Sequence, residues 1–172
     1  MELEVYHTQE LRSEELKFPC LAEGSQQWLG DGYYFWQDYE FSNWWGQNKK
    51  CGNGNRTRQF SIFKCILTFN EEDFIDTVFD EQDYYNFVAI VEKFAKKYIQ
   101  KNKSKPSLED FNDFISDFNI WGNIKVIRFQ DVPESDEHIE VKGFYYKKRI
   151  QLRVNEPEII SNFVHFKNLY CV

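Results

Sequence analysis

The stretch Trp28 to Phe35, Trp-Leu-Gly-Asp-Gly-Tyr-Tyr-Phe, decides how the rest of this sequence is interpreted. Gly30 and Gly32 carry no Cβ atom, so the backbone can turn tightly here or approach a ligand closely. The aromatic residues that follow suit a β-strand, in which successive side chains point to opposite faces. Tyr34 therefore points away from its two neighbours. The stretch predicts a glycine turn that brings one tyrosine ring to the floor of a pocket for a flat ligand.

Outside this stretch, hydrophobic patterns predict strands at both ends of the chain and helices between them. Glu81 to Asn102 is the clearest helix, because apolar residues recur at steps of three and four with Glu and Lys between them. A second helix is expected from Ser107, as its capping residue, to a point before Gly122. The expected strands are Glu2 to His7, Gln59 to Phe69, Phe74 to Val78, Ile124 to Phe129, Ile139 to Tyr146, Arg149 to Val154 and Val164 to Leu169. This order predicts a single α+β domain over residues 1–172, with a helical insertion at about 81–122.

Two further helices are expected nearer the N-terminus. Thr8 and Ser13 are each followed by Glu or Gln and then Leu, as in a helix cap, and Pro19 would end the helix. The aromatic residues between Gln37 and Gln47 have helical spacing. The polar, glycine-bearing sequence from Lys49 to Arg58 predicts a surface loop.

Composition favours a sheet-based core and argues against general nucleic-acid binding. Aromatic residues make up 19% of the 172 residues, and only one Met is present, so rings and β-branched residues must fill the core. The formal net charge is −7 and the pI is about 5.1. Sequence-independent affinity for nucleic acids depends on clustered Lys and Arg, which this balance disfavours unless a local basic patch is present.

The cysteines and histidines give no metal-binding pattern. None of the four cysteines forms a CxxC pair or has zinc-ligand spacing with the three histidines, so no metal is expected. The N-terminus lacks a secretion signal, and no apolar run approaches the roughly 20 residues of a membrane span. We therefore expect a cytoplasmic protein with reduced cysteines and no membrane contact, although the even cysteine count also permits a disulfide.

The glycine-aromatic stretch also resembles a known family. Together with Val5 to His7, it is similar to the diphtheria-toxin-like and poly(ADP-ribose)-polymerase-like ADP-ribosyltransferases, and most of all to bacterial relatives with a Trp-Leu-Gly-x-Gly-x-Tyr-Phe signature. The resemblance implies two small, mainly antiparallel sheets that form a cleft for NAD as co-substrate. It also implies a bacterial toxin or defence effector, with a macromolecular acceptor and a cognate partner protein.

The resemblance assigns roles to residues at both ends of the cleft. The family histidine at the position of His7 hydrogen-bonds the adenosine ribose of NAD. The next family residue is a glycine whose backbone binds the nicotinamide amide, and Thr8 stands there in this chain. Tyr34 would stack on the nicotinamide ring, and Gly32 and Tyr33 complete the expected cofactor-binding set. Without the resemblance, His7 is read as a strand-end histidine and Tyr34 as a core aromatic.

The third motif position differs from the family pattern. Aligning Gln-Leu-Arg-Val with the family's Glu-x-x-Val puts Gln151 at the place of the catalytic glutamate. Glutamine can still accept a hydrogen bond, but it lacks the negative charge that stabilises the transition state as nicotinamide leaves. Glu140, Glu156 and Glu158 lie nearby in the sequence without the motif spacing. An exposed strand glutamine is the structural alternative.

The segment before Gln151 is the expected acceptor contact, again by resemblance. Tyr145 to Arg149 places three cations beside two aromatic rings, which would suit an acidic protein or a nucleic-acid phosphate, or simply a solvated hairpin turn. The sequence contains no Walker loop, Gly-x-Ser-x-Gly or HExxH motif. It therefore predicts an NAD-dependent ADP-ribosyltransferase that modifies a macromolecule, with protein favoured over nucleic acid. The alternative is a domain of the same fold that binds NAD, ADP-ribose or a protein without turnover.

Overall fold

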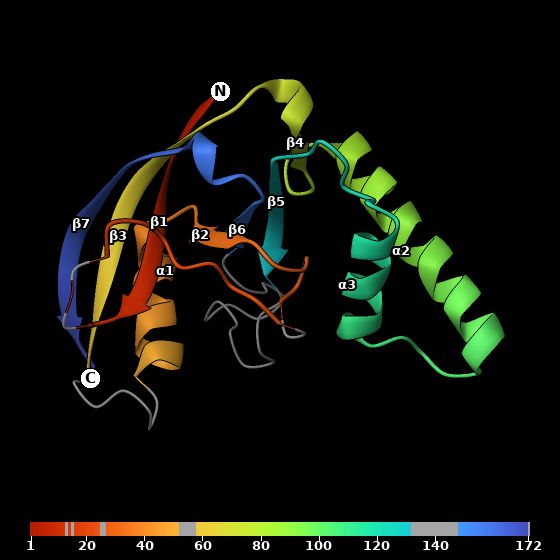
Figure 1. Cartoon of the computed structure of the whole chain (residues 1–172), viewed down its shortest axis with the longest axis horizontal. Coiled ribbons are helices and arrows are strands. Elements are labelled where there is room, and N and C mark those ends of the chain that lie inside the picture. Colours follow the sequence, from red (N-terminus) through yellow and green to blue (C-terminus); the bar gives the residue numbers. More distant parts are fainter. Residues whose placement is uncertain (13, 15, 25–26, 52–57, 132–147, 172) are drawn as a thin grey trace, which may run out of the picture.

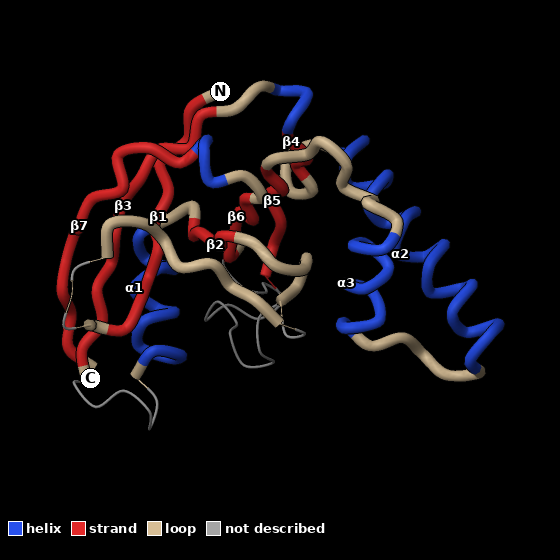
Figure 2. The backbone as a smooth tube through the Cα atoms, in the orientation of Figure 1, coloured by secondary structure: helices blue, strands red, loops and turns tan. Residues whose placement is uncertain are grey.

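The computed structural model describes residues 1–12, 14, 16–24, 27–51, 58–131 and 148–171, and its strands form one mixed seven-stranded sheet (Figures 1 and 2). The strands are β1 (Glu2–Glu10), β2 (Tyr33–Trp36), β3 (Gln59–Thr68), β4 (Phe74–Asp76), β5 (Val126–Asp131), β6 (Arg149–Val154) and β7 (Ile160–Tyr170). Their order across the sheet is β4-β5-β6-β2-β1-β3-β7. Only β4 and β5 pair in parallel among these strands; the other neighbours are antiparallel.

The helices confirm the periodic patterns in the middle of the chain. They are α1 (Tyr39–Trp45) with the π-helical turn η1 (Gly46–Lys50), α2 (Glu81–Asn102) and α3 (Leu108–Asp117), besides the 3-10 turns η2 (Glu71–Asp73) and η3 (Pro157–Ile159). Ser107 caps α3 through a reciprocal capping box with Asp110. The α2–α3 pair connects β4 to β5, and a parallel neighbour requires such a crossover. Within the described ranges, no helix is both long enough and apolar enough to cross a membrane.

The helix expected after Thr8 or Ser13 is wrong for the residues that the structure describes. β1 continues to Glu10 because it pairs with β3 from Glu2 onward without interruption. Thr8 lies inside this strand, and its hydroxyl group is hydrogen-bonded to Ser42 of α1 rather than to a helix N-terminus. The described residues between 11 and 22 contain no helix. Tertiary pairing therefore overrides the local capping pattern.

The core has two parts, one on each face of the sheet. The first cluster includes Val5, Phe35, Leu67, Val126, Leu152 and Val154. The second includes Leu29, Phe94, Phe111, Ile115, Ile127 and Phe129, which join the sheet to α2 and α3. Since adjacent residues of a strand point to opposite faces, Val126 and Ile127 show that the clusters lie on opposite sides. The position of α2 and α3 beside the β5 end of the sheet is visible in Figure 1.

The two halves of the sheet meet at a narrow junction. β1 and β2 share one register pair, Tyr6 with Trp36, whereas β1 pairs with β3 along its whole length. The structure therefore has one sheet where the sequence predicted two, but the strands β4-β5-β6-β2 and β1-β3-β7 share only this register pair among the described residues. The predicted strand at 139–146 lies outside the described residues.

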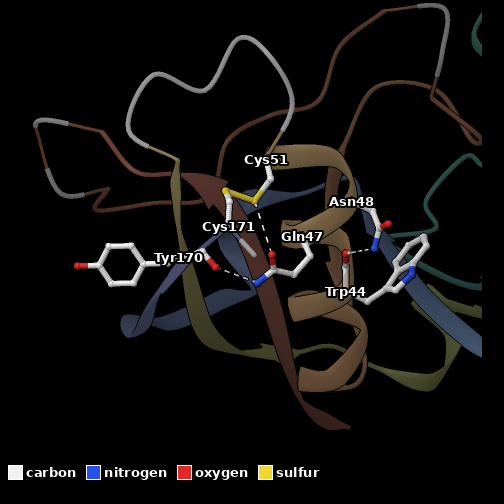
Figure 3. Close-up of a disulfide and its surroundings, with 6 residues drawn as sticks. All are labelled: Trp44, Gln47, Asn48, Cys51, Tyr170 and Cys171. Carbon is white, nitrogen blue, oxygen red and sulfur yellow. Dashed lines mark hydrogen bonds between the residues drawn. A yellow bond between two sulfur atoms is a disulfide. The ribbon is translucent and has the colours of Figure 1, made fainter.

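A disulfide ties the end of the helical turn to the end of the chain, which corrects the expectation of four reduced cysteines. Cys51 and Cys171 are bonded across a sequence separation of 120 residues. Figure 3 shows Gln47 beside this bond, with its side-chain amide donating to the Tyr170 carbonyl at 3.0 Å. Cys20 and Cys65 are free thiols. The predicted cytoplasmic location stays a prediction.

Candidate functional site

A cavity of about 460 Å³ lies where β1, β2 and β6 run next to one another, and we call it the β1–β2 cavity. Four of the six residues that the resemblance selects line it, namely His7, Thr8, Tyr34 and Gln151. They come from three strands, and in the sequence His7 and Gln151 are separated by most of the chain. The fold therefore brings together residues that were chosen from sequence alone.

The narrow junction between β1 and β2 explains how residues of both strands line one cavity. Beyond the pair of Tyr6 and Trp36 the two strands have no further register pairs. The His7 side chain bridges them instead, since its Nδ1 lies 3.1 Å from the Tyr34 carbonyl oxygen. His7 and Thr8 are adjacent and point to opposite faces, yet both line the cavity.

His7 is buried and neutral, with both ring nitrogens used by the protein. Only 7% of the residue is exposed. Because a carbonyl can only accept, Nδ1 carries the proton that is donated to Tyr34, and Nε2 accepts from the Cys20 amide at 3.4 Å. Burial lowers the pKa of His7 to about 4. His7 therefore fixes the backbone of Tyr34 and Cys20 by hydrogen bonds and carries no charge at neutral pH.

We expect His7 to make the protein less stable in acid, by about 3 kcal/mol between pH 7 and pH 4. Its folded pKa is about 4 against a usual value of 6.5. Above pH 6.5 the folded and unfolded chains are both neutral at this residue, so it adds no pH dependence. Between pH 6.5 and 4 the unfolded chain binds a proton that the folded chain does not, and the free energy of unfolding falls.

Urea unfolding from pH 7 to pH 4 measures this effect. His7→Gln should lose about 3 kcal/mol less stability than the wild type over this range, because the titrating ring is gone. His165→Gln, at an exposed position of β7, is the matched control and should retain the wild-type pH dependence. Equal pH dependence of the wild type and His7→Gln would contradict the prediction.

Thr8 lines the cavity, and α1 holds its side chain. The Thr8 hydroxyl donates to the Ser42 carbonyl oxygen at 2.8 Å, and the Ser42 hydroxyl lies 2.6 Å from the Thr8 oxygen. Both residues are buried. Since the Thr8 proton is already used, Ser42 is the donor in the second contact. The Thr8 side chain is therefore anchored on α1.

Tyr34 is held by the glycine turn that precedes it. Its hydroxyl donates to the Gly30 carbonyl oxygen at 2.7 Å and accepts from the Leu29 amide at 3.2 Å. Gly30 has a φ of 81°, which an L-residue with a side chain rarely adopts. The Tyr34 ring is half-buried and meets Phe129 edge-on at 6.2 Å. Burial raises the pKa of Tyr34, so its hydroxyl group stays protonated.

Gly32 and Tyr33 are not among the residues that line the β1–β2 cavity. The backbone of Gly32 exchanges hydrogen bonds of 2.9 and 3.0 Å with Ala22. A Cβ atom on Gly32 would lie 3.0 Å from the Arg153 side chain, so close packing explains this glycine. Tyr33 packs against the first core cluster and meets Phe18 edge-on at 5.6 Å. These two residues build the turn and the core that support Tyr34.

Gln151 is the residue through which β6 contributes to the cavity wall. It pairs in register with Trp36 of β2 and with Phe129 of β5, and only 9% of it is exposed. Among the acids that were considered as substitutes for the missing charge, Glu156 and Glu158 do not line the cavity. Glu140 lies outside the described residues. Gln151 is thus a buried cavity residue rather than an exposed strand glutamine.

Asp131 is a cavity residue that sequence reasoning missed. It ends β5 and lines the β1–β2 cavity, which gives that cavity a carboxylate. Its Oδ2 lies 3.4 Å from Nε of Arg149, whose guanidinium lies 4.2 Å from the centre of the Trp44 ring. The sequence predicted that this strand ends at Phe129. The alternation of side chains continues from Phe129 to Asp131, and this pattern could have indicated that the acid belongs to the strand.

Arg149, the last residue of the basic segment before Gln151, is not part of an exposed basic patch. Only 3% of Arg149 is exposed, and its charge is opposed by Asp131. Lys148 lies with its ammonium group 5.3 Å from the Phe79 ring centre. Tyr145, Tyr146 and Lys147 lie outside the described residues.

In the part of the chain that the structure describes, no group of three or more His, Cys, Asp or Glu residues is placed to bind a metal ion.

The β1–β2 cavity therefore combines aromatic rings, a neutral histidine and a buried amide side chain with charged groups of both signs, namely Asp131, Glu23, Arg12 and Lys50. This set can hold a flat ring and hydrogen-bond a polar ligand without a metal ion. Comparison of the chain with protein-family models, with curated protein sequences and with solved structures finds no match in any of the three.

Proposed function

We propose that this protein binds NAD in the β1–β2 cavity and acts as an ADP-ribosyltransferase-like enzyme on a macromolecular acceptor. Tyr34 would stack on the nicotinamide ring, His7 and the Thr8 backbone would position the dinucleotide, and Gln151 would contact the nicotinamide ribose. The bond from the ribose C1′ to the nicotinamide nitrogen breaks, and a bond from C1′ to an acceptor nucleophile forms. Nicotinamide leaves with the electron pair of the broken bond, and the acceptor group gives up its proton to water.

The observation that supports this proposal is the convergence of His7, Thr8, Tyr34 and Gln151 on one cavity. The resemblance selects these residues from the sequence alone, and they lie on β1, β2 and β6. The volume of about 460 Å³ falls within the usual range for small-molecule sites. The cavity also provides the flat ring that nicotinamide stacking needs.

A binding protein without turnover is the second candidate, and Gln151 is the observation that favours it. An amide cannot supply the negative charge that stabilises an oxocarbenium-like transition state. Two carboxylates line the cavity: Asp131, which faces the Arg149 guanidinium at 3.4 Å, and Glu23, which is exposed. The same fold would then sense NAD or ADP-ribose, or dock a protein, without releasing nicotinamide.

Nicotinamide release from NAD and calorimetric NAD binding separate these candidates. The variants are Tyr34→Ala, which removes the ring, and Tyr34→Phe, which keeps the ring and loses the hydroxyl group. We expect Tyr34→Ala to weaken NAD binding about tenfold or more and Tyr34→Phe to retain most of it, because stacking needs only the ring. Tyr85→Ala removes an exposed ring from α2 and is the control.

Release that depends on Tyr34 would support the enzyme, and a requirement for cell lysate would distinguish transfer from hydrolysis. Binding that depends on Tyr34 without release would support the sensor. If NAD neither binds nor loses nicotinamide, both NAD-based functions are wrong.

A further inference from the structure

A second cavity, of about 490 Å³, lies between the sheet and the helical pair, and we call it the α2 cavity. Apolar side chains make up most of its wall. They include Leu29, Phe87, Val88, Val91, Phe111 and Phe129. A concave apolar surface of this size with few polar groups is typical of a ligand or anchor site.

The cavity exists because α2 packs incompletely on the rest of the molecule. Only Phe94 is buried along its 22 residues. α2 is the outermost element on its side of the molecule, and α3 lies between it and β5 in the view of Figure 1. Phe87, Val88 and Val91 consequently stay half-exposed on the side of the helix that lines the cavity. Their apolar surface remains available to an occupant.

Two of the polar side chains in the wall, Thr77 and Asp131, are already engaged. The Thr77 hydroxyl donates to the Arg128 carbonyl oxygen at 2.9 Å. Asp131 forms its ion pair with Arg149. An occupant would therefore find few hydrogen-bonding partners, and a polar group buried here without a partner costs about 1–3 kcal/mol. The part of a ligand that enters this cavity should be apolar.

The α2 cavity adjoins the β1–β2 cavity, because Trp28 and Asp131 line both. Trp28 is 43% exposed and Tyr84, at the other side of the α2 cavity, is 48% exposed. Exposed Trp and Tyr beside an apolar hollow are typical anchor points of protein interfaces. A molecule with an apolar group in the α2 cavity can therefore reach the mouth of the β1–β2 cavity.

The charges near Tyr84 indicate which kind of macromolecule fits. Asp80, Glu81 and Asp83 form the N-terminal end of α2 directly before Tyr84. The whole chain has a formal net charge of −7. Phosphate groups of a nucleic acid would be repelled here, whereas a basic residue of a protein would be attracted.

We propose that the α2 cavity docks a large aliphatic or aromatic side chain of a partner protein, next to a basic residue of that partner. This inference rests on the proposed function, under which the partner is the acceptor. The docked side chain places a neighbouring nucleophile at the mouth of the β1–β2 cavity, beside Trp28 and Asp131. Specificity for the acceptor then comes from the helical insertion rather than from the residues around NAD.

The docking site is tested with amino-acid amides as probes, without NAD. N-acetyl-tryptophanamide and N-acetyl-leucinamide should bind saturably with a Kd of about 1 mM, at least about tenfold tighter than N-acetyl-serinamide. The indole N–H signal of Trp28 in a proton–nitrogen NMR spectrum, assigned with Trp28→Phe, reports binding. Val88→Trp fills the cavity and should weaken binding at least about tenfold.

Ala89→Trp is the matched control, because it adds the same ring at an exposed α2 position that does not line the cavity. It should bind the apolar amides as the wild type does. Equal binding of all three amides, or unchanged binding in Val88→Trp, would overturn the docking site whatever the protein does with NAD.

A second measurement addresses the acceptor role. With NAD and cell lysate, Val88→Trp should keep wild-type nicotinamide release into water but lose at least about tenfold in protein labelling from radiolabelled NAD. Labelling unchanged in Val88→Trp would overturn the acceptor role. Amide binding without any nicotinamide release would refute the transferase and leave the apolar docking site supported.

Discussion

Changing Gln151 to glutamate is expected to raise the rate of nicotinamide release from NAD about a hundredfold. In the proposed reaction, positive charge develops on the ribose as the glycosidic bond breaks, and a carboxylate at this position would stabilise it. A preorganised electrostatic contact of this kind is worth about 3–4 kcal/mol in the transition state. Gln151 already lies in the cavity wall between Trp36 and Phe129, so the substitution needs no change of register.

Initial rates at saturating NAD measure this gain. Gln59→Glu adds the same charge at the start of β3, outside the lining of the β1–β2 cavity, and should leave the rate at the wild-type level. Thermal unfolding should accompany the assay, because a buried carboxylate raises the cost of folding. A well-folded Gln151→Glu variant that binds NAD but releases no more nicotinamide than wild type would remove Gln151 from the catalytic position.

The sequence predicted those helices and strands that are determined by the residues of their own segment. α2 runs from Glu81 to Asn102 as its periodicity indicates, and its N-terminus is capped by Asp80. β6 begins and ends at the predicted residues, and β3 stops one residue short of the prediction. In each case the hydrophobic pattern, or a capping side chain, is contained in the segment itself. Such elements need little help from the rest of the chain.

Elements that depend on distant partners were harder to predict. Thr8 has a capping pattern, but the pairing of β1 with β3 and the hydroxyl contact with Ser42 decide its structure. The order β4-β5-β6-β2-β1-β3-β7 follows from no local signal. The short register between β1 and β2 also depends on the whole sheet, and it determines that His7 bridges to Tyr34.

The candidate site shows the same division. The residue types His7, Tyr34 and Gln151 were selected from sequence, but their hydrogen bonds were not. The Tyr34 hydroxyl returns to the glycine turn at Gly30. Asp131 enters the cavity only because β5 extends two residues beyond its predicted end. Residue identity was therefore predictable from motifs, whereas protonation and orientation required the fold.

Reducing the disulfide between Cys51 and Cys171 is expected to lower the free energy of unfolding by about 4 kcal/mol, the largest change in stability that we predict. The bond closes a loop of 120 residues. A link across so long a loop removes much conformational freedom from the unfolded chain, and the loss of freedom grows slowly with loop length. The two cysteines meet because of the β3–β7 pairing. This pairing brings Tyr170 opposite Gln59 and so places Cys171 near the helical turn η1.

Urea unfolding of the wild type, Cys51→Ser and Cys171→Ser, each with and without a phosphine reductant, measures this contribution. Reduction should bring the wild type down to the stability of the two variants and leave both variants unchanged. Cys20→Ser removes a free thiol and should respond to the reductant as the wild type does. Lys50 and Trp45 line the β1–β2 cavity and lie just before Cys51, so NAD binding should also weaken on reduction if the bond supports that wall. Four free thiols in the oxidised protein, or a wild type indifferent to reductant, would show that the bond does not contribute.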